Sequence, residues 1–177
     1  ASSELDDNAS TITGGTGTSD TLEVAVDASD TLLLNSVSAI ETVKTTGTGG
    51  GTVTTTATIA DAVVASGKSM TFDYTSMDDD ALTLDVSAES NGTYTIKTDG
   101  TGAMIITLGQ GADTYTGTST GVDTIVATKG ANTIKTGDGV DIITLGTGVD
   151  TLTVGVTGDG GDADLVKFTA TNQLVTN

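Results

Sequence analysis

The sequence predicts an all-β protein built from many short strands. Thr, Val and Ile are β-branched and favour strands, whereas the abundant Gly is a poor helix former. Apolar residues alternate with polar ones at a period of two, as at Leu22, Val24 and Val26. This alternation is typical of strands with one buried face. Turns rich in Gly and Asp separate such runs, for example between Gly14 and Asp20.

Further strand-like stretches follow along the chain. They lie at residues 32–44, 52–59, 82–86, 94–96, 103–108 and 165–168. The first of them reads as a strand, a short turn and a second strand, with Glu41 and Lys44 facing outward. Asn91 and Gly92 lie between two alternating runs and suit either a type I′ hairpin or the corner of a solenoid. The last residues, 169–177, are either a strand donated to a neighbour or a frayed end.

The composition excludes several classes of function. The 177 residues include 24 Asp and Glu but only 6 Lys and no Arg, which gives a net charge of −18, and His, Cys, Pro and Trp are absent. Without His or Cys, the usual zinc sites and the Ser-His-Asp and Cys-His nucleophiles are excluded, so we expect no enzyme. The negative charge and the scarcity of aromatic rings argue against nucleic acid as a partner. No apolar run approaches the roughly 20 residues of a spanning helix, so no membrane insertion is expected.

The clearest pattern is a nine-residue repeat that begins at Leu108. Its blocks are LGQGADTYT, TSTGVDTIV, ATKGANTIK, TGDGVDIIT and LGTGVDTLT, with an extra Gly117 after the first. The fourth position is always glycine: Gly111, Gly121, Gly130, Gly139 and Gly148. The sixth is Asp113, Asp123, Asn132, Asp141 and Asp150. The eighth is large and apolar, from Tyr115 to Leu152. The fifth is Ala or Val, which predicts an additional inward contact.

These blocks resemble the calcium-binding nonapeptide of RTX proteins, G-G-x-G-x-D-x-U-x, which builds a parallel β-roll. The first Gly of the motif is replaced throughout, and the second survives as Gly109, Gly137 and Gly146. The resemblance implies a parallel β-solenoid or β-roll with calcium-binding nonapeptide turns. We expect a less regular Thr/Gly-rich solenoid over residues 1–106 and the nonapeptide roll with its closing strand over 107–177, or one continuous solenoid.

In the roll that the resemblance implies, blocks 18 residues apart stack on the same side. One column then holds Asp123, Asp141 and Asp159, and the other Asp113, Asn132 and Asp150. Calcium takes six to eight oxygen ligands, which turn carbonyls and carboxylates supply. Stacked carboxylates repel one another unless a cation lies between them, so folding and metal binding should be coupled. We expect the first column to bind Ca²⁺ better and the Asn132 column to be partly vacant.

The candidate calcium ligands are the turn aspartates and the fourth-position glycines, whose freedom lets the backbone aim its carbonyls inward. They are Asp113, Asp123, Asp141, Asp150, Asp159, Asp162, Asp164, Gly111, Gly121, Gly139 and Gly148, together with Asp20 in a degenerate block at residues 14–22. Asp27 and Asp30 are candidates to join Asp20.

The alternative is that such turns are solvated corners without metal, and this interpretation is favoured for residues 78–80. A glycosidase pair formed by Asp162 and Asp164 is disfavoured because so few aromatic rings are present to hold a sugar.

The segment at residues 37–43, of the form V-x-x-I-E-T-V, and the Thr-, Gly-, Ala- and Asp-rich composition resemble the solenoid portions of RTX-type bacterial surface-layer proteins. This resemblance implies a secreted, calcium-dependent structural protein that self-assembles into a surface layer or extracellular filament. It implies location at the extracellular cell surface, export by type I secretion from a Gram-negative bacterium, other copies of the chain as partners, and cell-surface polysaccharide as a candidate anchor. The alternatives are a calcium-binding repeat module of a large RTX adhesin, or such a module of a secreted enzyme.

Overall fold

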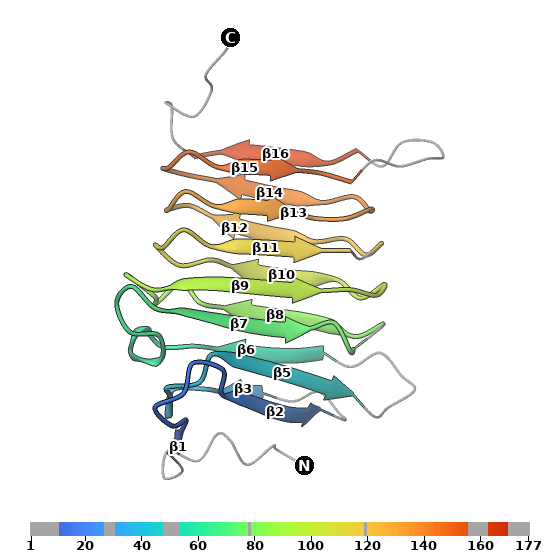
Figure 1. The fold of residues 1–177 in the computed structure, drawn as a ribbon. Helices are drawn as coiled ribbons and strands as arrows, with labels where there is room; N and C mark the ends of the chain where they lie inside the picture. The colour runs from blue at the N-terminus through green and yellow to red at the C-terminus, as the bar shows by residue number, and fades with distance from the viewer. Residues whose placement is uncertain are drawn as a thin grey trace.

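The computed structural model is a parallel β-solenoid made of two seven-stranded sheets (Figure 1). It describes residues 11–26, 31–47, 54–77, 79–118, 120–155 and 163–169. The chain alternates between the two sheets, and every described strand pairing is parallel. The prediction of an all-β parallel solenoid is therefore confirmed. No helix in these ranges has the length and apolar character that crossing a membrane requires.

One sheet, here the β2 sheet, contains seven strands. They are β2 (Thr21–Val26), β5 (Thr42–Gly47), β7 (Ser69–Tyr74), β9 (Thr93–Thr98), β11 (Thr114–Gly117), β13 (Thr133–Lys135) and β15 (Thr151–Thr153). The other, the β3 sheet, contains β3 (Thr31–Leu33), β6 (Thr54–Thr58), β8 (Ala81–Asp85), β10 (Met104–Thr107), β12 (Thr124–Ala127), β14 (Ile142–Leu145) and β16 (Leu165–Phe168). A small pair, β1 (Ile12–Thr13) with β4 (Val37–Ser38), and one 3₁₀ turn, η2 (Asp61–Val63), complete the described elements.

The coils are shortest and most regular in the nonapeptide blocks. In the β2 sheet, Thr42 pairs with Thr71, 29 residues later, whereas Ile134 pairs with Leu152, 18 residues later. The longer coil carries η2 on its corner. Both sheets continue past residue 106, since β10 pairs with β8 and β12 in the β3 sheet and β9 pairs with β11 in the β2 sheet. The division at this residue stays a prediction.

The core lies between the sheets and is filled by alternate residues of each strand. On β10, Met104 and Ile106 are fully buried while Ile105 is 48% exposed. Burying one such aliphatic side chain contributes roughly 1.5–3 kcal/mol. The largest buried side chains include Tyr74, Tyr94, Tyr115 and Phe72.

The corners of the solenoid include position five of the repeat and Gly92. Position five of the repeat does not point inward: Val122, Val140 and Val149 are 51%, 43% and 85% exposed. The prediction of an inward contact there is wrong, because side chains alternate in direction and the sixth position, which follows it, takes the inward place. Gly92 precedes a strand, β9, that pairs in parallel with β7 and β11. It therefore belongs to a solenoid corner and not to a hairpin.

The outer face of the β2 sheet carries a continuous row of threonines. In register they are Thr21, Thr42, Thr71, Thr95, Thr114, Thr133 and Thr151. The row beside it begins with alternating charges, Glu23, Lys44, Asp73 and Lys97. Opposite charges on neighbouring strands favour this register over a slipped one.

We predict opposite outcomes for two adjacent substitutions on β10. Ile106→Ala should lower the free energy of unfolding by about 2–5 kcal/mol, because it leaves a cavity between the sheets. Ile105→Ala, the matched control, should change it by less than about 0.5 kcal/mol, because that side chain is half exposed. Urea denaturation at saturating calcium measures both, and equal losses would contradict this assignment of faces.

Candidate metal-binding turns

The fourth-position glycines of the repeat stack directly on one another from coil to coil. A Cβ at Gly130 would collide with the carbonyl oxygen of Gly111, and a Cβ at Gly148 with that of Gly130. The φ angles of Gly130 and Gly148 are +83° and +125°, which side chains rarely tolerate. Glycine therefore lets the turns approach closely, with the carbonyl oxygens of one turn directed at the next.

The sixth-position side chains turn inward and join neighbouring coils. In the Asn132 column, Asp113 Oδ1 accepts the backbone N–H of Tyr94 at 2.9 Å. Asn132 Oδ1 accepts the N–H of Asp113 at 3.1 Å, and Asp150 Oδ1 accepts that of Asn132 at 2.9 Å. Asp113 and Asn132 are each 1% exposed. Each turn is thus attached to the preceding one through a carboxylate or amide oxygen.

The Asp123 column follows the same rule. Asp123 Oδ1 accepts the N–H of Met104 at 3.1 Å, and Asp141 Oδ1 accepts the N–H of Asp123 at 2.9 Å. The next step is Asp164, whose Oδ1 accepts the N–H of Asp141 at 3.0 Å. Ile142 accordingly pairs with Leu165, 23 residues later.

Asp164 therefore takes the place that the 18-residue spacing gave to Asp159, because this coil is longer than the two-block coil. Asp159 and Asp162 lie outside the described residues, so their predicted role as ligands stays a prediction.

Stacked carboxylates do not face one another directly in these columns. Backbone N–H groups lie between them, and a hydrogen bond to a charged acceptor contributes roughly 1.5–3 kcal/mol. This compensation is incomplete at Asp113, where burial raises the pKa of the carboxyl group. The hydrogen bonds from Tyr94 and Gly109 oppose that rise, while the charge of Glu89 adds to it.

A buried polar network in the core links the Asp123 column to Tyr115. Its hydroxyl donates to Asp123 Oδ2 at 2.8 Å and lies 2.9 Å from the hydroxyl oxygen of Thr98. Burial, and then the charge of Asp123, raise the pKa of Tyr115, so the phenol stays protonated. Gly117, the extra residue after the first block, makes room: a Cβ there would lie 2.8 Å from the Tyr115 hydroxyl oxygen. Sequence reasoning interpreted Tyr115 as an apolar core residue only.

The same attachment recurs in the N-terminal half. Asp20 Oδ2 accepts the N–H of Gly15 at 3.1 Å, and Glu41 Oε2 accepts the N–H of Asp20 at 2.8 Å. Asp20 therefore takes part in a ladder step through its backbone N–H, and its predicted role as a calcium ligand stays a prediction. Glu41, predicted to face outward, turns back to the neighbouring coil because its longer side chain can reach the N–H below it.

A sequence signal for these steps exists. It is a three-residue motif, in which an acidic or amide residue is followed by Thr and then by a large apolar residue. The motif starts at Asp20, Glu41, Asp113, Asp123, Asn132 and Asp150.

The acidic turn at residues 78–80 lies outside the repeat and makes different contacts. Asp79 accepts the hydroxyl of Thr101 at 2.7 Å, and Asp80 is 5% exposed and so is not a solvated turn residue. The interpretation of residues 78–80 as a solvated turn is therefore wrong for Asp80, whose side chain is enclosed. Asp27, Asp30 and Asp78 lie outside the described residues.

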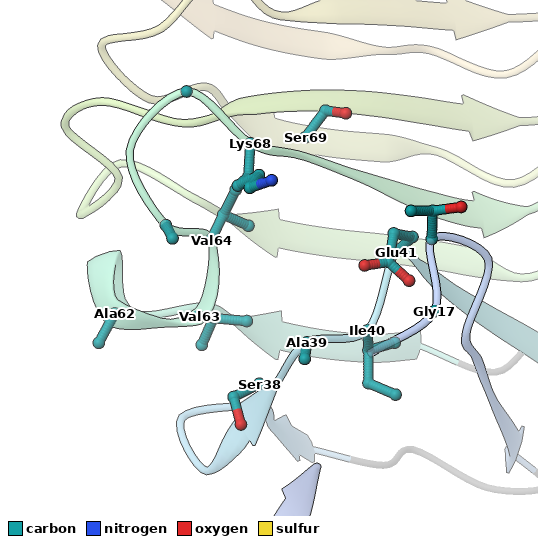
Figure 2. A pocket seen from close by; sticks show the side chains of 13 residues that line it. Gly17, Ser38, Ala39, Ile40, Glu41, Ala62, Val63, Val64, Lys68 and Ser69 are labelled. Carbon is teal, nitrogen blue, oxygen red and sulfur yellow. The ribbon is translucent and has the colours of Figure 1, made fainter. Parts of the chain in front are cut away.

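A hollow of about 540 Å³ opens beside Glu41 (Figure 2). Its walls come from the β1–β2 loop, the corner before β5 and the segment between η2 and β7. They include Gly17, Ala39, Ile40, Glu41, Val63, Val64 and Lys68. Most of this lining is aliphatic or small, so the hollow lacks the convergent oxygens that the turns provide.

The donor set of the turns fits calcium. Carbonyl and carboxylate oxygens are the ligands that this hard cation prefers. Asp150 Oδ2 is buried without a hydrogen-bond partner, which leaves an oxygen available to a cation. Within the described ranges no three acidic side chains converge. Backbone carbonyls, including those of the stacked glycines, would thus supply most of the ligands, with one or two carboxylates at each site.

Comparison with known families agrees with this chemistry. Residues 117–152 match the family model of the RTX calcium-binding nonapeptide repeat, in four copies. This segment, called the RTX array below, is similar to that family of repeats. Calcium is therefore its cofactor. The first block, with Asp113, precedes the matched residues but carries the same hydrogen-bond ladder. Comparisons with curated proteins and with solved structures found no match.

We predict that Asn132→Asp makes the protein more dependent on calcium. Asn132 Nδ2 donates to Lys129 O at 2.8 Å and to Asp150 Oδ1 at 3.0 Å. A carboxylate would lose both bonds and repel Asp150, which costs about 1–3 kcal/mol at low calcium.

Each additional ion bound on folding should steepen the calcium dependence of the unfolding free energy by about 1.4 kcal/mol per tenfold change in concentration. Urea denaturation at a series of calcium concentrations measures this slope. Asn35→Asp adds the same charge at an exposed turn and should leave the slope unchanged. An unchanged slope in Asn132→Asp would contradict the gain of a further calcium ion in this column.

We also predict that calcium binding weakens as the pH falls toward the ordinary carboxyl range. Because the pKa of Asp113 is raised above 3.8, its protonated form persists to a higher pH, and calcium must displace that proton. Calorimetric titrations at pH 5 in buffers of different ionisation enthalpy should detect proton release, which Asp113→Asn should reduce. Equal proton release in both proteins would contradict the role of Asp113 as a ligand.

Proposed function

We propose that the chain is a secreted structural protein that folds on calcium and assembles end to end into a surface layer or extracellular filament. The RTX array already marks a calcium-binding protein of the secreted type. The assembly is our inference from the shape of the solenoid and from its surface.

The observation that carries the proposal is how the two sheets end. In the strand order of the described residues, β2 and β3 close the sheets at one end, and β15 and β16 at the other (Figure 1). An end strand offers N–H and C=O groups to another strand. Because both ends present parallel strands of the same two sheets, a second copy can continue the stack head to tail. Such a heterologous contact produces an open assembly.

The surface supports the same proposal. The outer threonine row gives a flat wall of small polar side chains, which suits a coat better than a ligand-binding cleft. On β16, Leu165 and Phe168 are 49% and 47% exposed, which is apolar area available to a neighbouring copy. The net charge of −18 keeps copies apart until divalent cations screen it. Attachment to a cell-surface polysaccharide and export by type I secretion remain expectations from the surface-layer resemblance.

The direct test is a calcium titration from EDTA to about 10 mM, followed by far-UV circular dichroism and light scattering. This range covers the affinities of extracellular calcium modules. We expect a transition from coil to β structure and then the growth of large particles. Folding without growth would contradict assembly and favour a repeat module of an adhesin or secreted enzyme.

Phe168→Pro tests whether growth uses the end strand. Leu165 and Thr169 direct their N–H groups to Asp141 O and Leu145 O on the inner side. In a parallel ladder the N–H of Phe168 therefore points outward, so proline there removes a donor from the free edge while the pairing with β14 remains. Growth should slow at least about tenfold, because each added copy loses a strand hydrogen bond worth roughly 1.5 kcal/mol. Phe168→Thr removes the ring but keeps the N–H and should still assemble. Undiminished growth of Phe168→Pro would rule out pairing through β16.

A further inference from the structure

A second kind of acidic site lies outside the RTX array, at the corner between β8 and β9. Glu89 is 0% exposed there, although carboxylates are rarely buried without partners. Its Oε1 accepts the backbone N–H groups of Asn91 at 2.8 Å and Gly92 at 2.6 Å. Its Oε2 is buried and accepts no hydrogen bond. One oxygen of this carboxylate is thus held firmly while the other has no partner from the protein.

The corner is shaped around this side chain. A Cβ at Gly92 would lie 3.1 Å from Glu89 Cδ, and one at Gly109 would lie 3.1 Å from Glu89 Cβ. The backbone of Glu89 is held as well, since its N–H donates to Val86 O and its carbonyl accepts the N–H of Gln110. Glu89 is therefore fixed in position and cannot turn to solvent.

A second carboxylate reaches the same corner from a different coil. Asp61, the first residue of η2, accepts both the N–H and the hydroxyl of Ser90 through Oδ1, each at 2.7 Å. The side chain of Glu89 also interacts with the Asp61 carboxyl group, and the pKa of Asp61 is lowered, chiefly by the hydrogen bonds from Ser90. Asp61 is consequently anionic at neutral pH, and its Oδ2 is not used by Ser90.

Nothing in the described part of the protein neutralises this pair. No lysine there forms an ion pair with Asp61 or Glu89. The backbone of Lys68 lies close to this corner in space, because its carbonyl accepts the N–H of Thr93. The side chain of Lys68, however, lines the hollow of Figure 2. Two adjacent carboxylates without a protein cation either share a proton or bind a metal ion.

We propose that Glu89 Oε2 and the Asp61 carboxylate bind a calcium ion at the β8–β9 corner. Both ligands are hard oxygens, and the exposed side of Asp61 gives water access to complete the shell. The ion joins η2 to the coil on which the first nonapeptide block stacks. The site differs from the repeat turns, because it lies outside the nonapeptide blocks and both of its protein ligands are side-chain carboxylates, one of them a glutamate. It does not depend on assembly.

The test counts calcium ions bound to the full chain by equilibrium dialysis against calcium chloride. Glu89→Gln and Asp61→Asn should each bind one ion fewer than the wild type. The double variant should also bind one fewer, not two fewer, because both residues serve one ion. Asp85→Asn is the matched control: Asp85 accepts the N–H of Ser87 in the same corner, and its loss should leave the count unchanged.

An unchanged count in Asp61→Asn or in folded Glu89→Gln would overturn the proposal and indicate a shared proton. If Glu89→Gln fails to fold, Asp61→Asn decides alone, since that side chain is exposed. If the wild type bound no calcium ion at all, this proposal and calcium binding by the repeats would both be contradicted. The number of ions and the growth of particles are separate readouts, so this site can fail without the proposed function failing.

Discussion

The structure depends on the hydrogen bond that one coil makes to the backbone of the coil before it through an inward acidic or amide side chain. The bond runs from Met104 N–H to Asp123 and from Asp123 N–H to Asp141. It fixes the height of each turn, which in turn fixes the pairing of the strands that follow. Together with the strand pairing, these bonds hold the coils in register where the glycine turns approach closely. The same geometry brings together the oxygens that calcium requires, so the fold and the candidate metal sites depend on the same contacts between coils.

Much of this was predictable from local chemistry. Alternation at a period of two identified the strands, because a buried face tolerates only apolar residues at alternate positions. The nine-residue spacing of Gly130 and Gly139 identified the turns, because the contact of stacked backbones excludes every side chain. The fixed sixth position of the repeat identified Asp113 as a turn residue of interest, although not its inward direction. These features depend on residues within one block, and the same sequence signal occurs in every copy of the repeat.

The remaining features depend on contacts between coils, which spacing alone does not give. Asp164 replaces Asp159 in the column because the last described coil is five residues longer than the regular one. The Tyr115–Asp123 bond crosses the core and requires the space left by Gly117. Position five was misjudged because hydrophobicity alone suggested burial, whereas the strict alternation of the backbone decided its direction. Glu89 carries no motif, and only its enclosure by the neighbouring coil distinguishes it.

The regular coil has a consequence for how such a protein can change in length. Ile134 and Leu152 occupy equivalent places 18 residues apart, and strands contact mainly their nearest neighbours in the stack. Duplicating one such unit would preserve every inward and outward position and lengthen the molecule by one strand spacing, about 4.8 Å. Adding or removing a single residue within a strand would turn its whole buried face to solvent. Variation in this part of the molecule should therefore occur in whole coils, which makes length a property that evolution can adjust in discrete steps.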